Sequence, residues 1–394
     1  MVASARRGRV DPLSLGEPGT KADVGRMIAR GSAESQTIGI CRVLCIFFMM
    51  NVHIDPGPVE SSIVHGGAFS WVGAVWIDFL GRTSVAALSL ISGYLLVRNG
   101  AAHGFPDFAR RRFVALILPM LTWNLLYCFA VVLVAAIEGK PVPREFTSTL
   151  SAVSSLTGLA GPTENLSLFF LRDIFVASLV AYGIQPLLRR FPLPVLGLVA
   201  LLAVFELTEP VIFRPSILLF VCLGVVAAQR VDSLSDLVLP RRLVPCLLAV
   251  GAALFLCHVT GLGARGFGVA IEDILRRLLL SAGVITLATQ LAETWAGARI
   301  VPFEERIFET YLMHAALFHA VWAIWRRTIG GAAGPSYLVF FLLAPVVAVV
   351  AGQAVGAVTD HLAPPLRIAL RGHARLATPP RAATRASAPG VRRP

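Results

Sequence analysis

An arginine and a histidine with ten residues between them stand within one strongly apolar segment, at Arg42 and His53. An α-helix turns by ~100° per residue, so eleven steps return the chain to within about 20° of its starting face. Both side chains would then lie on one stripe, roughly 16 Å apart along the axis at ~1.5 Å per residue. An ionisable residue inside a membrane helix indicates a functional site, because it is costly to place there. The alternative is that the arginine reaches one membrane surface and the histidine rests at the other.

The composition indicates a membrane protein rather than a soluble enzyme or a nucleic-acid-binding module. Hydrophobic residues make up 56% of the 394 residues and charged residues only 15%, whereas a soluble domain carries about a quarter charged residues. The net charge of +12 gathers in two tails and in short loops between apolar runs, as expected of residues that set membrane topology. The six cysteines show neither a disulfide framework nor a metal-binding spacing, so we expect no metal site.

Ten apolar segments are long enough, or nearly so, to cross a bilayer. They lie at about 37–54, 72–97, 113–137, 166–187, 192–207, 211–229, 243–259, 272–292, 306–326 and 336–359. The predicted fold is therefore an all-α polytopic membrane helix bundle of about ten transmembrane helices. Arginines concentrate in alternate loops and in both tails, which predicts that both termini are cytoplasmic.

The two tails differ in composition from the predicted transmembrane domain at residues 37–359. Residues 1–36 and 360–394 are rich in Arg, Ala, Gly, Pro and Ser, so we expect them to be disordered basic cytoplasmic segments. The longest predicted outer loop, at about 138–165, either covers a binding site or serves only as a connector.

This topology places a cluster of ionisable groups at the depth of His53, in the outer half of the membrane. Asp78 and Arg82, four residues apart, share a helix face and can pair. Arg172 with Asp173, Arg214, and Arg276 with Arg277 come from three further segments. The alternative role for such groups is to form ion pairs that hold the helices together.

A second set is purely cationic and lies at the predicted inner surface. It consists of Arg42, Arg110, Arg111 and Arg112. Arginines in this position suit the binding of phosphate groups. Taken individually, residues 110–112 are better explained as a topology anchor.

Further motifs follow the Arg42–His53 pair in a specific order. They are Ser92-Gly93-Tyr94, a basic run from Phe108 to Tyr127 with Pro119 and Trp123, Phe169-Phe170-Leu171-Arg172-Asp173, and Tyr311-Leu312-Met313-His314. In this ordered set the chain resembles the acyltransferase-3 family of integral membrane O-acyltransferases, over about residues 37–359. Two positions depart from the family pattern. Ala115 stands where a second arginine of an Arg-x-x-Arg motif is common, and Phe169 replaces a tryptophan.

The resemblance implies transfer of an acyl group, usually acetyl from acetyl-CoA, to a hydroxyl of a saccharide. Acceptors in this family are typically lipid-linked saccharides for exopolysaccharide or other envelope glycans, so we expect a multi-pass protein of the bacterial inner membrane. Acyl-CoA, a saccharide or glycolipid and the bilayer are then the expected partners, with no nucleic acid. The sequence identifies neither the acceptor saccharide nor whether the acyl group is acetyl or a larger group.

The residues then take the following expected roles. Arg42 with Arg110, Arg111 and Arg112 binds the phosphates of coenzyme A. His53 removes the proton of the acceptor hydroxyl, or else carries the acyl group transiently. Asp78 or Asp173 orients the imidazole, and Arg82 or Arg172 stabilises the oxyanion. His314 is either a second functional histidine or a buried structural one.

Two other functions fit the composition. A transporter or flippase of glycolipids would also have many spans and intramembrane charges. Transporters commonly contain internal repeats, and none is visible between residues 37–207 and 211–359. A non-catalytic subunit of a polysaccharide-synthesis complex is the third possibility, and only loss-of-activity data would exclude it.

Overall fold

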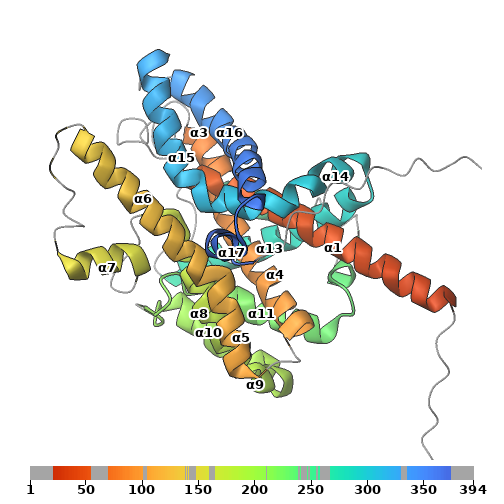
Figure 1. Cartoon of the computed structure of the whole chain (residues 1–394). Coiled ribbons are helices and arrows are strands. Elements are labelled where there is room, and N and C mark those ends of the chain that lie inside the picture. The colour runs from red at the N-terminus through yellow and green to blue at the C-terminus, as the bar shows by residue number, and fades with distance from the viewer. Residues whose placement is uncertain are drawn as a thin grey trace, which may run out of the picture.

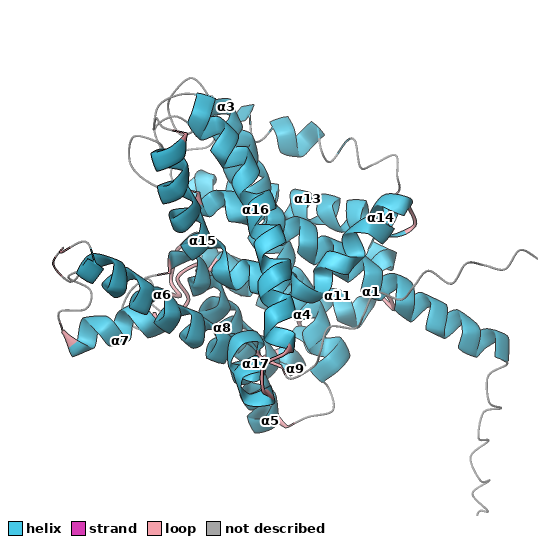
Figure 2. Ribbon diagram, turned by 45° about the horizontal axis from the view of Figure 1, so that its top comes forward, coloured by secondary structure: helices cyan, strands magenta, loops and turns pink. Residues whose placement is uncertain are grey.

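The computed structural model describes residues 21–54, 70–100, 104–137, 148–158, 165–209, 211–237, 267–329 and 335–373, with a few further positions between 139 and 257. Every regular element within these residues is a helix, and they contain no strand. The helices form one bundle, from which the N-terminal part of α1 extends (Figures 1 and 2). The all-α prediction is confirmed.

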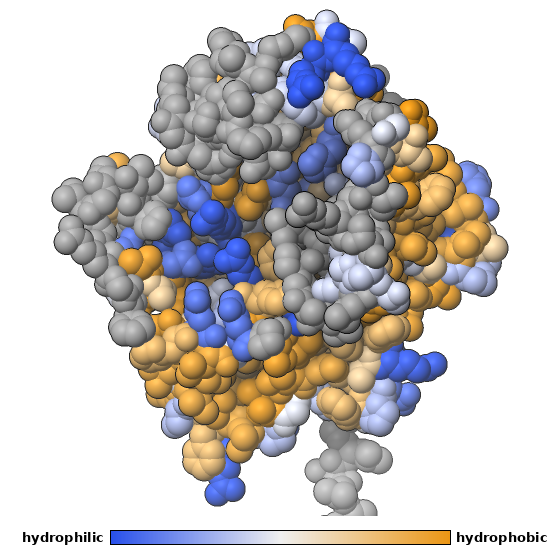
Figure 3. All heavy atoms as spheres, turned by 90° about the vertical axis from the view of Figure 1, so that its left-hand side faces the viewer, coloured by the Kyte–Doolittle hydropathy of each residue, from blue (hydrophilic) through white to orange (hydrophobic). Residues whose placement is uncertain are grey.

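Six stretches of helix are long and apolar enough to cross a membrane. They are built from α1 (Lys21–Met50) with η1 (Asn51–His53), α3 (Ser70–Gly73) with η2 (Ala74–Gly81) and α4 (Arg82–Gly100), α5 (Phe105–Arg112) with η3 (Phe113–Ile117) and α6 (Leu118–Ile137), α13 (Phe267–Ala292), α14 (Trp295–Ile300) with η7 (Val301–Arg306) and α15 (Ile307–Thr328), and α16 (Pro335–Asp360). The chain is therefore a multi-pass membrane protein. Figure 3 shows the broad hydrophobic surface that this requires, with hydrophilic side chains gathered in a recess.

Shorter helices complete the described chain. They are α7 (Thr149–Thr157), η5 (Leu166–Leu168), α8 (Phe169–Gly183), α9 (Gln185–Arg190), α10 (Pro192–Val204), α11 (Ser216–Arg230), η6 (Leu234–Leu237) and α17 (Pro364–Arg371). Three of them, α8, α10 and α11, coincide with predicted spans but have only 15, 13 and 15 residues. At ~1.5 Å per residue they reach about 20–23 Å, less than the ~30 Å hydrocarbon core. The predicted segment 243–259 lies mostly outside the described residues, so the count of about ten is not confirmed.

Two glycines allow a close helix crossing between α4 and α11. A Cβ atom on Gly93 would lie 2.0 Å from the carbonyl oxygen of Val221, and one on Gly224 would lie 2.0 Å from that of Leu90. Small residues let membrane helices approach closely enough for backbone-to-backbone contact. Gly93 of the Ser-Gly-Tyr motif therefore has a structural role, which is to let α4 pack directly against α11.

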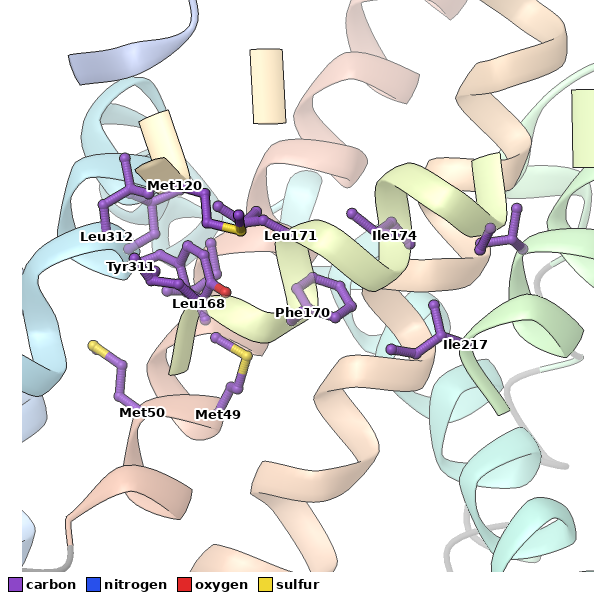
Figure 4. Packing of buried hydrophobic residues seen from close by; sticks show 14 of the residues in the cluster. Met49, Met50, Met120, Leu168, Phe170, Leu171, Ile174, Ile217, Tyr311 and Leu312 are labelled. Carbon is purple, nitrogen blue, oxygen red and sulfur yellow. The ribbon is translucent and has the colours of Figure 1, made fainter. Parts of the chain in front are cut away.

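The main hydrophobic cluster lies where α1, α6, α8 and α15 meet. Met49 of α1 is 2% exposed and points toward Phe170 of α8 and Tyr311 of α15 (Figure 4). The Tyr311 hydroxyl donates a hydrogen bond of 2.7 Å to the carbonyl oxygen of Ser167. This bond and the packing around it hold the start of α8 against α15.

Both predicted disordered tails contain helix. Helix α1 begins at Lys21, so residues 21–36 are helical, because this stretch lacks proline and is rich in helix-forming residues. Helix α17 lies inside the predicted tail 360–394. Pro364 and Pro365 favour a helix start there, and Arg371 is only 3% exposed. The remainder of the predicted tails, residues 1–20 and 374–394, lies outside the described residues.

Candidate active site

Two cavities lie on either side of the C-terminal half of α1. The cavity that contains Arg42 has a volume of about 570 Å³ and is lined by α1, α4, η3, α8, η7, α15 and the end of α17. The cavity that contains His53 has a volume of about 470 Å³. We call them the Arg42 cavity and the His53 cavity. Met49 is buried and lines both of them, so its side chain borders the two spaces.

The end of α1 explains why Arg42 and His53 line different cavities. The α-helix stops at Met50 and continues as a 3₁₀ turn through His53. Asn51 stabilises this change, since its side-chain amide donates 3.2 Å hydrogen bonds to the carbonyl oxygens of Phe47 and Phe48. A 3₁₀ turn rotates by about 120° per residue, so three steps add about 60° to the angle expected for an α-helix. This rotation would turn His53 by about 60° from the position that a continuous α-helix predicts for it.

The two candidate histidines are neighbours. The ring centroids of His53 and His314 are 5.3 Å apart, with an angle of 58° between the planes. His314 is fully buried, and its Nδ1 lies 2.5 Å from the carbonyl oxygen of Tyr311. Because a carbonyl can only accept, this hydrogen bond requires the proton on Nδ1, which leaves the lone pair of a neutral ring on Nε2. That Nε2 is buried without a hydrogen-bond partner among the described residues, so it can accept a proton.

The two candidate carboxylates pair with arginines instead of with His53. Asp78 lies 3.1 Å from Arg82, as the four-residue spacing predicts. Asp173 is fully buried; it accepts a 2.9 Å hydrogen bond from the backbone N–H of Arg214 and lies 3.4 Å from Arg172. None of the described hydrogen bonds joins either carboxylate to His53, because both are already engaged by these cations. His314 is the ionisable neighbour of His53 that sequence reasoning did not pair with it.

The two arginines proposed for oxyanion stabilisation lie in different places. Arg82 lines the His53 cavity together with Arg214 and Arg277. The Arg172 guanidinium instead lies 4.1 Å from the ring centroid of Phe213 and lines a third, mostly apolar cavity of about 520 Å³ beside α6 and α8. Of these two arginines, Arg82 shares a cavity with His53 and is therefore the one placed to stabilise an oxyanion formed there.

The Arg42 cavity contains only part of the predicted cationic set. Arg42 and Arg112 line it, whereas Arg110 and Arg111 are exposed and do not. Arg42 forms an ion pair of 3.1 Å with Glu304 of η7. Exposed Arg110 and Arg111 therefore suit the role of topology anchors, and Arg112 suits ligand binding.

Several residues of this cavity were not found from the sequence. They are Glu304, Glu305, Arg371 and His373. The two glutamates carry no recognisable spacing, and the other two lie in the segment that composition marks as a tail. After Pro364 and Pro365, Arg367 and Arg371 stand four residues apart among apolar residues. This amphipathic helix pattern is the signal that could have identified α17. Within the described ranges, no three His, Cys, Asp or Glu side chains gather as they would around a metal ion.

Comparison with known proteins gives one family and one relative. The family model described as an acyltransferase domain matches residues 36–353. The succinoglycan biosynthesis protein ExoH of Rhizobium meliloti (strain 1021) is 28% identical over 367 residues, which cover 88% of this chain and 95% of that protein. No solved structure gives a significant match. The matched region contains Arg42, His53 and His314 and ends before α17.

Proposed function

The chain belongs to the acyltransferase family whose domain model it matches, and we propose that it is an O-acyltransferase that modifies a saccharide at the bacterial inner membrane. The donor is acyl-CoA, with acetyl as the group transferred, and it binds from the cytoplasm. The acceptor is a hydroxyl group of an envelope or exported saccharide. The relative is a succinoglycan biosynthesis protein, which supports a saccharide acceptor.

The observation that carries this proposal is the position of Met49 on the walls of both cavities. The Arg42 cavity contains arginines suited to binding phosphates. The His53 cavity contains His53, whose ring lies beside that of His314. Methionine is unbranched and flexible, so it can move aside for a narrow chain. The arrangement suits a donor whose charged end stays in one cavity while its thioester reaches the other.

The Arg42 cavity suits the phosphate-bearing end of coenzyme A. Arg42 and Arg112 provide two guanidinium groups, which bind phosphates through paired N–H groups. Glu304 now holds Arg42 at 3.1 Å, and a phosphate would compete with this carboxylate. The exposed Arg110 and Arg111 beside the cavity favour the cytoplasmic side for its opening.

The His53 cavity suits the acyl transfer itself. A saccharide hydroxyl is a weak nucleophile, and the His53 imidazole takes its proton as its oxygen attacks the thioester carbonyl carbon. Arg82, with its partner Asp78, lies where it can stabilise the negative charge on the carbonyl oxygen. The carbon–sulfur bond then breaks, and the leaving thiolate receives the proton from His53. The unpaired Nε2 of His314 provides a second acceptor for this proton.

The proposal is tested with purified protein, radiolabelled acetyl-CoA and a saccharide extract from the cell envelope. We expect label in the saccharide and an equal amount of free coenzyme A. His53→Ala should abolish both, and Arg42→Ala should raise the donor KM. Transfer that survives His53→Ala would refute the assigned base, and no transfer from any acyl-CoA would refute the acyltransferase and favour a transporter.

A further inference from the structure

Helix α17 lies beyond the region that the family model matches, yet its C-terminal end lines the Arg42 cavity. Arg371, Gly372 and His373 all contribute to the wall of this cavity. The helix packs against α6 and η3 (Figures 1 and 2). A segment that composition marks as a tail is thus part of the candidate donor site.

Arg371 anchors this segment through a buried ionic network. Its Nε lies 2.6 Å from Glu309 of α15, and its Nη1 donates a 2.6 Å hydrogen bond to Asp360 at the end of α16. Asp360 also pairs with Arg306 at 2.9 Å. With an exposure of 3%, the Arg371 guanidinium is held by these two carboxylates, which balance its charge. Its role is therefore to hold the chain in place.

Two contacts continue the attachment on either side of Arg371. The indole N–H of Trp123 on α6 donates a 3.1 Å hydrogen bond to the carbonyl oxygen of Leu370. Gly372 has a φ of +76°, and a Cβ atom there would lie 2.6 Å from the Cα atom of Ala115. Only glycine fits this left-handed position against the backbone of η3. Gly372 therefore packs directly against η3, the π-helix that follows Arg112.

We propose that α17 forms a wall of the donor-binding site and that Arg371 is the positioning residue that holds Gly372 and His373 at the cavity. This inference rests on the proposed function, because it assigns the Arg42 cavity to acyl-CoA. The ligand of this wall is the phosphate-bearing end of the donor, beside Arg42 and Arg112. The helix itself takes no part in the proton transfer at His53.

The test uses the full-length protein and measures the KM for acetyl-CoA, the KM for the saccharide extract and kcat. Replacement of Arg371 alone would leave Glu309 without its cation, so the main variant is the double change Arg371→Gln with Glu309→Gln. Asp360 keeps Arg306 as a partner in this variant. Arg371→Lys tests rescue by a retained charge. Arg367→Gln is the matched control, because Arg367 lies one turn earlier on α17 and is not among the described residues that line the cavity.

We expect the double variant to raise the acetyl-CoA KM at least tenfold and to leave kcat and the acceptor KM within twofold. Arg371→Lys should recover part of the loss, and Arg367→Gln should behave as the wild type. If the double variant does not fold, His373→Ala removes an exposed side chain from the same wall, and a rise in donor KM is again expected.

Two results overturn the inference in different ways. A folded variant with an unchanged donor KM, in an enzyme that does transfer acyl groups, refutes the role of α17 alone. A wild-type protein that neither binds nor uses acyl-CoA refutes the proposed function, and with it this inference.

Discussion

Replacement of Met49 by phenylalanine tests whether the donor passes between the two cavities. Met49 is 2% exposed and lines both spaces, so a rigid ring there obstructs the path without touching Arg42 or His53. Forcing extra volume into a packed site costs about 1–3 kcal/mol. If the thioester must displace this ring in the transition state, transfer slows by about 5- to 150-fold, at 1.36 kcal/mol for each factor of ten.

The assay is acetyl transfer from acetyl-CoA to the saccharide extract, with the dissociation constant of coenzyme A measured alongside. We expect a lower kcat and an unchanged dissociation constant, because the phosphate site lies in the Arg42 cavity. Met50→Phe is the matched control, since Met50 is fully buried in the same cluster but is not among the described residues lining either cavity. An equal loss of activity in both variants would refute a path at Met49.

Three further perturbations follow from the contacts described above. Glu304→Gln should lower the acetyl-CoA KM by about 1.4- to 5-fold, because a partly exposed ion pair of about 0.2–1 kcal/mol no longer competes for Arg42; a higher KM would mean that Glu304 positions the arginine for the donor. His314→Gln should reduce kcat by at least the ~10²-fold typical of acid–base groups, with an unchanged donor KM; a loss of thermal stability at full kcat would instead identify a structural histidine. Gly224→Ala should lower the unfolding temperature in detergent, because its Cβ would lie 2.0 Å from the Leu90 carbonyl oxygen and overpacking costs about 1–3 kcal/mol; an unchanged temperature would show that α4 and α11 can separate freely.

The sequence predicted the parts of this molecule that depend on local pattern. Hydrophobic runs located the long helices, because a membrane span requires many consecutive apolar residues. The four-residue spacing of Asp78 and Arg82 predicted their ion pair. The position of α8, α10 and α11 was also visible, but their short length was not, since apolar flanking residues extended the predicted segments.

The parts that depend on tertiary contacts were not predictable. Whether His53 meets Asp78, Asp173 or His314 depends on how three helices pack, and the carboxylates pair with arginines that lie nearer. The 3₁₀ turn after Met50 changes the direction of His53, and no residue type marks it in advance.

Arg371 illustrates the same difficulty at the C-terminus. Its burial depends on Glu309 and Asp360, which are 62 and 11 residues away in the chain. Amino-acid composition alone predicts a basic tail there, because it counts the arginines but does not show that Arg371 pairs with Glu309 and Asp360.

The central claim is that the acyl group enters beside Arg42 and leaves beside His53. The most direct test encloses the saccharide extract in proteoliposomes and adds radiolabelled acetyl-CoA only outside. Molecules whose Arg42 cavity faces outward should label the enclosed saccharide, and His53→Ala vesicles should not. Label that appears only when donor and acceptor are on the same side of the membrane would contradict a path from one cavity to the other.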